Sequence, residues 1–174
     1  MAEKTIPRWY AVYVKSRYEK KTSKLLKEKN IEVYLPLVNR LKQWSDRKKM
    51  VEEPLFKSYL FVRTDLKNYY DILNTPGIVR FIGFEGKPVY VPDNQIVAVR
   101  QFVGEFDDSS CLDELQDLHE GQMVEIVYGE MKGLVGRLLF IQGRQRLVVD
   151  IESVGRSIPI NISRSQVRLL QNGL

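Results

Sequence analysis

The chain has 174 residues, of which 44% are hydrophobic and 28% charged, and its formal net charge is +5. This composition is ordinary for a globular protein, and the length allows one domain of average size or two small ones. No apolar run reaches the roughly 18–20 residues of a membrane span, and the N-terminus lacks the apolar core of an export signal. A single cysteine, Cys111, excludes an intramolecular disulfide. We therefore expect a cytoplasmic protein with no membrane partner.

Charge is distributed unevenly along the chain. Residues 1–103 are basic, whereas residues 104–117 carry only acidic charges, at Glu105, Asp107, Asp108, Asp113, Glu114 and Asp117. A basic body suggests an anionic partner, and an acidic strip suggests a solvated linker. A basic surface that serves only solubility is an equally good interpretation of the first part.

The first elements alternate between strand and helix. Residues 9–14 are aromatic and β-branched, which predicts a strand. Ser16 and Glu19 have the spacing of a capping box, which predicts a helix from there to about residue 30. Residues 31–41 are expected to be extended, and Pro36 among them favours an edge position.

The next segment is a basic hairpin or loop at 43–53, and it contains Arg47, Lys48 and Lys49. Further elements follow in chain order: a central strand at 56–62, a helix at 67–74, strands at 78–82 and 88–91, and a helix at 93–103. This order predicts an α+β domain in which helices pack on an antiparallel sheet.

The second part of the chain has a different sequence pattern. Short β-rich runs alternate with glycine turns, at 123–127, 134–141, 146–151, 157–162 and 166–170. Five strands in so few residues predict a small β-barrel of SH3-like size. The expected domains are therefore 6–103, an acidic linker at 104–117, and a barrel at 118–174.

Few residues could support catalysis. His119 is the only histidine, and Cys111 has no basic neighbour that would lower its pKa. No Cys/His cluster has the spacing of a metal site. Gly129, Gly133 and Gly136 are spaced loosely like a phosphate loop, but no helix pattern follows them, so tight turns are the better interpretation. We expect no enzyme, no cofactor and no metal.

Aromatic residues are concentrated in the predicted sheet. Phe56, Tyr59 and Phe61 lie on or beside one strand, and Trp9, Tyr10 and Tyr13 lie on another. Most of these side chains should belong to the core. A small sheet buries both faces only if helices or a partner cover both. An uncovered aromatic face would dock another protein.

Several of these segments resemble the NusG family of transcription elongation factors. Residues 9–13 resemble the start of the family's N-terminal (NGN) domain, and residues 53–62 resemble its central segment, particularly in the specialised RfaH-like and UpxY-like branch. Residues 75–83 resemble the following turn and strand. The glycine and aliphatic pattern of residues 121–136 is similar to the KOW motif. The resemblance covers about 6–103 and 118–171 in the family's order.

The resemblance implies a docking site for bacterial RNA polymerase. In the family, an apolar concavity of the NGN domain grips the clamp helices of the largest polymerase subunit, and the matching positions here are Tyr13, Phe56, Tyr59 and Phe81. A Thr-rich patch of the specialised branch contacts the gate loop of the second-largest subunit. This chain has Asn68, Tyr69 and Tyr70 in that neighbourhood, so the second contact is open.

The resemblance also implies contacts with nucleic acid and with a partner of the barrel. Non-template DNA or nascent RNA would meet the basic residues Lys15, Arg17, Lys20, Lys21, Lys24, Arg47, Lys48 and Lys49. An aromatic residue before a Gly-Arg pair helps general NusG proteins bind ribosomal protein S10 or Rho. Val154 precedes Gly155 and Arg156 here, so S10 stays open as a partner and Rho is not expected.

Taken together, the sequence predicts a monomeric, specialised NusG paralogue that suppresses pausing and termination at particular operons. Surface-polysaccharide operons are the target that a UpxY-like resemblance implies. Two alternatives remain open: a housekeeping NusG, and a ribosome-associated KOW protein that binds RNA. The latter would need a strongly basic barrel, whereas residues 118–174 are only weakly basic.

Overall fold

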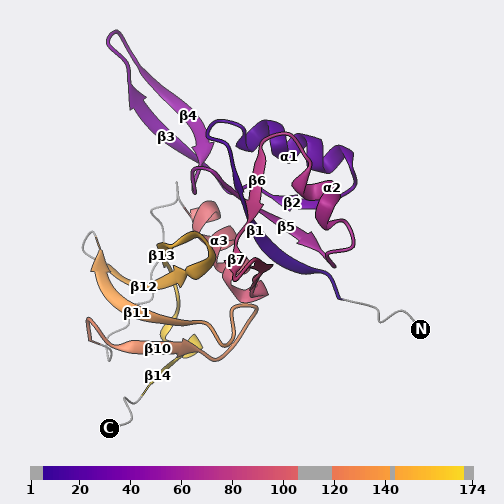
Figure 1. Ribbon diagram of the computed structural model, residues 1–174. Helices are drawn as coiled ribbons and strands as arrows, with labels where there is room; N and C mark the ends of the chain where they lie inside the picture. The colour runs from indigo at the N-terminus through magenta and orange to yellow at the C-terminus, as the bar shows by residue number, and fades with distance from the viewer. Residues whose placement is uncertain (1–5, 106–118, 142–143, 171–174) are drawn as a thin grey trace. The chain divides into compact units, whose positions relative to one another are not determined.

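The computed structural model describes residues 6–105, 119–141 and 144–170 (Figure 1). The chain forms two compact units that divide between Pro92 and Asp93. Both are built on antiparallel sheets and carry α-helices. This confirms the predicted α+β fold class.

The first unit is a five-stranded antiparallel sheet with helices on one face. The strand order is β2-β5-β1-β6, and β9 also pairs with β1. Its elements are β1 (Arg8–Val14), α1 (Glu19–Glu28), β2 (Glu32–Tyr34), β5 (Tyr59–Thr64), α2 (Tyr69–Leu73), β6 (Ile78–Phe81) and β9 (Tyr90–Val91). The predicted central strand is indeed interior, although it begins at Tyr59 rather than Phe56.

The core of this unit lies between the sheet and the two helices. Alternate residues of β1 and β5 point toward the helices, where they meet Leu26 of α1 and Ile72 of α2. Its buried residues are Tyr10, Val12, Val14, Leu26, Ile31, Leu60, Val62, Ile72 and Phe81. Each fully buried aliphatic side chain contributes about 1.5–3 kcal/mol. The packing is close at Gly77, which has φ +99°, because a Cβ there would lie 2.2 Å from Thr22 Oγ1.

The start of α1 differs from the prediction. The helix begins at Glu19 with Tyr18 as its N-cap, and no side chain caps it. Arg17 has φ +67°, so the chain turns sharply after Ser16 and carries that side chain out of capping range. The Glu19 carboxylate instead accepts a hydrogen bond from the backbone N–H of Ser58 at 2.8 Å. The predicted capping box is therefore wrong.

Two hairpins leave the main sheet. β3 (Leu37–Gln43) and β4 (Lys48–Pro54) pair only with each other and form a long ribbon that projects from the unit (Figure 1). The hairpin is longer than the one predicted at 43–53. The smaller hairpin joins β7 (Gly83–Phe84) to β8 (Lys87–Pro88).

The second unit is a five-stranded antiparallel sheet with strand order β13-β12-β11-β10-β14. Its strands are β10 (Met123–Ile126), β11 (Val135–Ile141), β12 (Arg144–Ile151), β13 (Arg156–Ile160) and β14 (Val167–Leu169), with 3-10 turns η1 (Glu152–Val154) and η2 (Arg164–Gln166). Gly136 of β11 has no room for a side chain, since a Cβ would lie 2.7 Å from the Val148 carbonyl oxygen. All five strands fall where the sequence predicted them.

Helix α3 (Asp93–Glu105) packs on the barrel. The Gln101 side-chain amide donates to the Asn161 carbonyl at 2.7 Å, and that of Asn94 donates to the Lys132 carbonyl at 3.2 Å. These contacts group α3 with the second unit, whereas the sequence analysis assigned residues 93–103 to the first domain. Most of the predicted acidic linker, residues 106–117, and Cys111 within it lie outside the described residues.

Candidate functional site

The face of the first sheet that points away from the helices is rich in aromatic side chains. In the antiparallel register Tyr13 is opposite Tyr59, and Phe61 is opposite both Ala11 and Tyr34. Side chains alternate between the two faces of a strand, so these residues share one face. We call Tyr13, Tyr34, Phe56, Tyr59 and Phe61 the aromatic face.

The aromatic face is a network of ring contacts. Tyr13 and Tyr59 meet edge to face with centroids 5.4 Å apart, and the Arg80 guanidinium lies 5.9 Å from the Tyr13 ring. Phe61 is fully buried and contacts Phe56, whose ring is 6.2 Å away. Tyr13 and Tyr59 are half-buried, whereas only 4% of Phe56 is exposed. The two tyrosines can therefore contact a partner, whereas Phe56 is buried against Phe61.

Phe81 does not belong to this face, which corrects its grouping with Tyr13, Phe56 and Tyr59. Phe81 pairs in register with Val12, whose side chain points to the helices. Its ring stacks on Tyr69 at 4.8 Å and packs in the helix-side core. Sequence alone left this open because the register of β6 against β1 decides which face Phe81 takes.

The candidate second contact begins just before α2. Asn68 precedes the helix and is exposed. Tyr70 is 72% exposed, whereas Tyr69 turns inward onto Phe81. Asn68 and Tyr70 are thus available to a partner, and Tyr69 is a core residue.

The basic residues around α1 are all exposed: Lys15, Arg17, Lys20, Lys21 and Lys24. Two of them have partners within the unit. Lys20 bonds the Glu52 carboxylate at 2.8 Å, and the Lys21 ammonium lies 5.5 Å from the Tyr18 ring. The set forms a cationic surface beside the start of α1.

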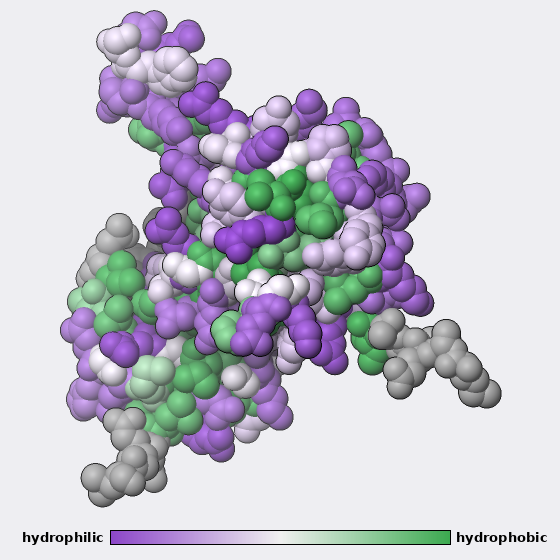
Figure 2. Space-filling view, viewed as in Figure 1, coloured by the Kyte–Doolittle hydropathy of each residue, from purple (hydrophilic) through white to green (hydrophobic). Residues whose placement is uncertain are grey.

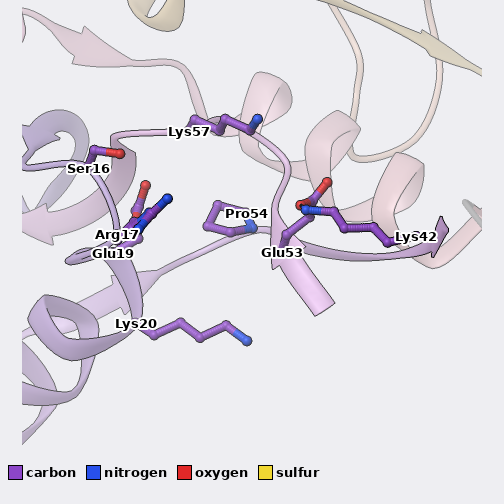
Figure 3. Close-up of a pocket in the computed structure, with 8 residues that line it drawn as sticks. All are labelled: Ser16, Arg17, Glu19, Lys20, Lys42, Glu53, Pro54 and Lys57. Carbon is purple, nitrogen blue, oxygen red and sulfur yellow. Dashed lines mark ion pairs between the residues drawn. The ribbon is translucent and has the colours of Figure 1, made fainter. Parts of the chain in front are cut away.

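An open pocket of about 440 Å³ lies between the start of α1 and the base of the β3–β4 hairpin (Figure 3). Four cations and two carboxylates contribute to its lining, which consists of Ser16, Arg17, Glu19, Lys20, Lys42, Glu53, Pro54 and Lys57. Excess positive charge in a concave surface favours an anion such as a phosphate group. Lys42 and Lys57 were absent from the predicted set because they reach α1 from distant positions in the sequence, Lys42 on the hairpin and Lys57 in the turn after it.

Within this pocket Glu53 is tied to the hairpin. Its carboxylate lies 2.6 Å from the Lys42 ammonium and 3.3 Å from the Arg40 guanidinium. The hydrogen bond from Lys42 chiefly lowers the pKa of Glu53 below its ordinary value, and the charges of Lys42, Arg40 and Lys57 lower it further.

Arg47, Lys48 and Lys49 lie at the far end of the hairpin and are exposed. None of the three belongs to the lining of the pocket beside α1. Figure 2 shows the projecting hairpin as mostly hydrophilic, with pale, less polar atoms at its end. The predicted basic residues therefore form two groups, one beside α1 and one at the hairpin end.

On the barrel, Val154 is buried and Arg156 is exposed. Gly155 between them has φ +60° and turns the chain from η1 into β13. Only Arg156 of the predicted partner-binding pair is presented to solvent.

Within the part of the chain that the structure describes, no group of three or more His, Cys, Asp or Glu side chains could hold a metal ion. None of the helices there is long and apolar enough to span a membrane. The exposed His119 contributes a backbone N–H that donates to the Gln122 side chain.

The fold and these surfaces define a binding protein of two units, with an aromatic sheet face and a cationic arm on the first and a small β-barrel in the second. The family model described as "Transcription termination factor nusG" matches residues 7–100. The chain belongs to the NusG family and is a NusG-type transcription factor.

Curated relatives extend the match to nearly the whole chain. The transcription termination/antitermination protein NusG of Lactococcus lactis is 25% identical over 94% of this chain and 93% of its own length. The protein of the same name from Thermus thermophilus is 26% identical over 91% of this chain and 96% of its own. A solved structure titled "Domain interaction in Thermotoga maritima NusG" has a TM-score of 0.52 at 23% identity and covers 95% of this chain and 98% of that one, which supports the fold.

Proposed function

We propose that this protein is an elongation and antitermination factor that binds the clamp helices of the largest subunit of bacterial RNA polymerase. The observation that carries the proposal is the aromatic face, where Tyr13 and Tyr59 meet edge to face on the side of the sheet opposite α1 and α2. The relatives' names, transcription termination/antitermination protein NusG, agree with this role. The protein acts in the cytoplasm as a monomer and catalyses no reaction.

The aromatic face would receive the partner's helices as a groove receives an amphipathic helix. A few aromatic residues carry most of the binding free energy at such surfaces. Tyr13 and Tyr59 are the anchors in this proposal, and the buried Phe56 accepts a hydrogen bond from the Tyr59 backbone N–H at 3.2 Å through its carbonyl. Asn68 and Tyr70 supply a second contact, to the gate loop of the second-largest subunit. Joining two parts of the polymerase would oppose the opening that accompanies pausing.

Nucleic acid is the second proposed ligand. The exposed cations beside α1 and the pocket at the hairpin base would bind phosphates of the non-template DNA strand or the nascent RNA. Such contacts release counterions, so the affinity falls as the salt concentration rises.

The barrel is proposed to be a KOW domain. Its strand order and glycine turns support this assignment. Arg156 is the residue available to a partner such as ribosomal protein S10. The buried Val154 offers no exposed aromatic contact, which disfavours Rho.

Two versions of this function differ in where the protein acts. We favour a specialised paralogue, for instance one that acts at surface-polysaccharide operons, because the basic first unit and Val154 distinguish this chain from a housekeeping NusG. Housekeeping NusG is the alternative, favoured by relatives of that name that match over nearly the whole chain. Chromatin immunoprecipitation separates the two: occupancy confined to a few operons supports the specialised version, and occupancy of most transcribed genes supports the general one.

The polymerase contact is tested by binding to a purified clamp-helix fragment. Tyr59→Ala should weaken binding by roughly thirtyfold, the equivalent of about 2 kcal/mol at a hot spot. Phe84→Ala is the matched control, because Phe84 is 72% exposed on a different hairpin of the same unit. Equal binding by the wild type and Tyr59→Ala would refute the proposed surface.

A further inference from the structure

Within the part of the chain that the structure describes, the β3–β4 hairpin is an arm that pairs with no other strand. It forms a sheet of only two strands, and every residue from 39 to 50 is exposed. A two-stranded ribbon is marginally stable by itself. Lys42 and Lys49 are directly opposite in its register, and like charges in that arrangement destabilise a hairpin. Glu53 forms an ion pair with Lys42, whereas no described carboxylate does so with Lys49, so the arm keeps a charge that its own fold disfavours.

The ion pairs of the arm involve the glutamates at the end of β4, since Glu53 pairs with Arg40 and Lys42 and Glu52 pairs with Lys20. The turn and the start of β4 carry three cations against the single carboxylate of Asp46. At the end, no described carboxylate forms an ion pair with Arg47, Lys48 or Lys49. The end of the arm is thus suited to an external polyanion.

Apolar side chains are exposed at the same end. Leu41 and Met50 are opposite each other in the register, and 60% and 53% of their surfaces are exposed. Trp44 lies in the connecting turn, where its backbone N–H donates to the Arg47 carbonyl at 2.8 Å, and it is 55% exposed. An exposed aromatic ring surrounded by cations is the combination with which proteins bind unpaired bases, because the ring stacks on the base while the cations contact phosphates.

We propose that the end of the β3–β4 hairpin binds an unpaired strand of nucleic acid, with Trp44 stacked on a base and Arg47, Lys48 and Lys49 on the phosphates. This inference deepens the nucleic-acid contact proposed above and rests on it. It adds to that proposal a separate binding site at the hairpin end, the requirement that the nucleic acid be unpaired, and Trp44 as the residue that stacks on a base.

The distribution of charge favours a single strand over a duplex. A ribbon that lies lengthwise in a major groove would need free cations along its length, whereas Arg40 and Lys42 are paired with Glu53. The free cations and the exposed tryptophan coincide only at the end, where a contact of a few nucleotides fits.

The test is a titration of the full-length protein with fluorescently labelled oligodeoxythymidylate, oligouridylate of the same length, and a hairpin duplex, at several salt concentrations. Trp44→Ala should weaken binding to a single strand about tenfold and leave the salt slope unchanged. Trp44→Phe should retain most of the affinity. A Lys48→Gln/Lys49→Gln double variant should reduce the salt slope by about 1.4, since each phosphate contact contributes about 0.7.

Matched controls make each outcome decisive. Phe84→Ala removes an exposed aromatic from the other hairpin and should bind like the wild type. Tyr59→Ala should also bind the oligonucleotides like the wild type. The nucleic-acid site at the hairpin end is therefore tested independently of the proposed polymerase contact. Trp44-dependent binding to DNA or to RNA supports the proposal, and comparison of the oligodeoxythymidylate and oligouridylate titrations shows which of the two is preferred. A preference for the duplex, equal binding by Trp44→Ala, or no binding at low salt would overturn it.

Discussion

Tyr69 and Tyr70 are adjacent in sequence, but the side chain of Tyr69 packs against the core and that of Tyr70 is exposed to solvent. The Tyr69 ring stacks on Phe81 at 4.8 Å and packs against the core between sheet and helices. Tyr70 is 72% exposed and meets only the edge of the Tyr69 ring, at 5.2 Å. We therefore expect Tyr69→Ala to affect folding and Tyr70→Ala to affect the proposed second polymerase contact.

The magnitudes follow from burial. Truncating a fully buried large aromatic residue costs about 3–5 kcal/mol. Tyr69 is half-buried, so about 2 kcal/mol is expected, and loss of the Phe81 pair adds about 1 kcal/mol. The free energy of unfolding should thus fall by about 3 kcal/mol in Tyr69→Ala. Tyr70→Ala should change it by no more than about 0.5 kcal/mol.

Urea unfolding can report on the first unit alone. The chain has two tryptophans, and in a Trp44→Phe background only the buried Trp9 of β1 remains to fluoresce. With a urea dependence of about 1–3 kcal/mol/M, Tyr69→Ala should lower the unfolding midpoint by about 1–3 M. Equal midpoints for the two variants, or a larger loss in Tyr70→Ala, would refute this assignment.

Three further substitutions test the packing and charges of the first unit. Gly77→Ala should cost about 2 kcal/mol or more, because a side chain at φ +99° is strained and its Cβ would meet Thr22; the same urea titration measures it, and an unchanged midpoint would contradict it. Glu19→Ala leaves the half-buried Ser58 N–H without its acceptor, so a loss of about 1 kcal/mol or more is expected, whereas a neutral result would mean that water replaces the carboxylate. Because the pKa of Glu53 is lowered, its ion pairs persist above that pKa and are lost as the pH falls through it. A pH titration followed by the NMR shift of the Glu53 carboxyl carbon should give a pKa below 4.5, and this pKa should rise in Lys42→Met. An unchanged pKa in Lys42→Met would exclude Lys42 as the main cause.

Much of the fold could be predicted from local patterns. The strands of the barrel are β-branched runs between glycine turns, and both features act locally. The aromatic, β-branched pattern of residues 9–14 likewise predicted β1. The β3–β4 hairpin was predicted too short, because its strands are rich in Lys, Arg and Glu, which carry little strand signal. Only pairing across the turn defines its length.

The site was predictable to a lesser degree because it depends on register and on distant contacts. Tyr13 and Tyr59 could be selected from their strands, and the antiparallel pairing brings them together. The register of β6 sends Phe81 to the other face. The pocket residues Lys42 and Lys57 reach α1 through the hairpin and through the turn after it, and no local pattern encodes that approach.

The most direct measurement of the central claim is the lifetime of a paused elongation complex of bacterial RNA polymerase in single-round transcription. Wild-type protein should shorten the pause, and Phe84→Ala should act equally well. Tyr59→Ala, which removes half of the Tyr13–Tyr59 pair, should require a roughly thirtyfold higher concentration for the same effect. If wild-type protein leaves pause lifetimes unchanged, or if Tyr59→Ala shortens them at the same concentration, the aromatic face is not how this protein acts on the polymerase.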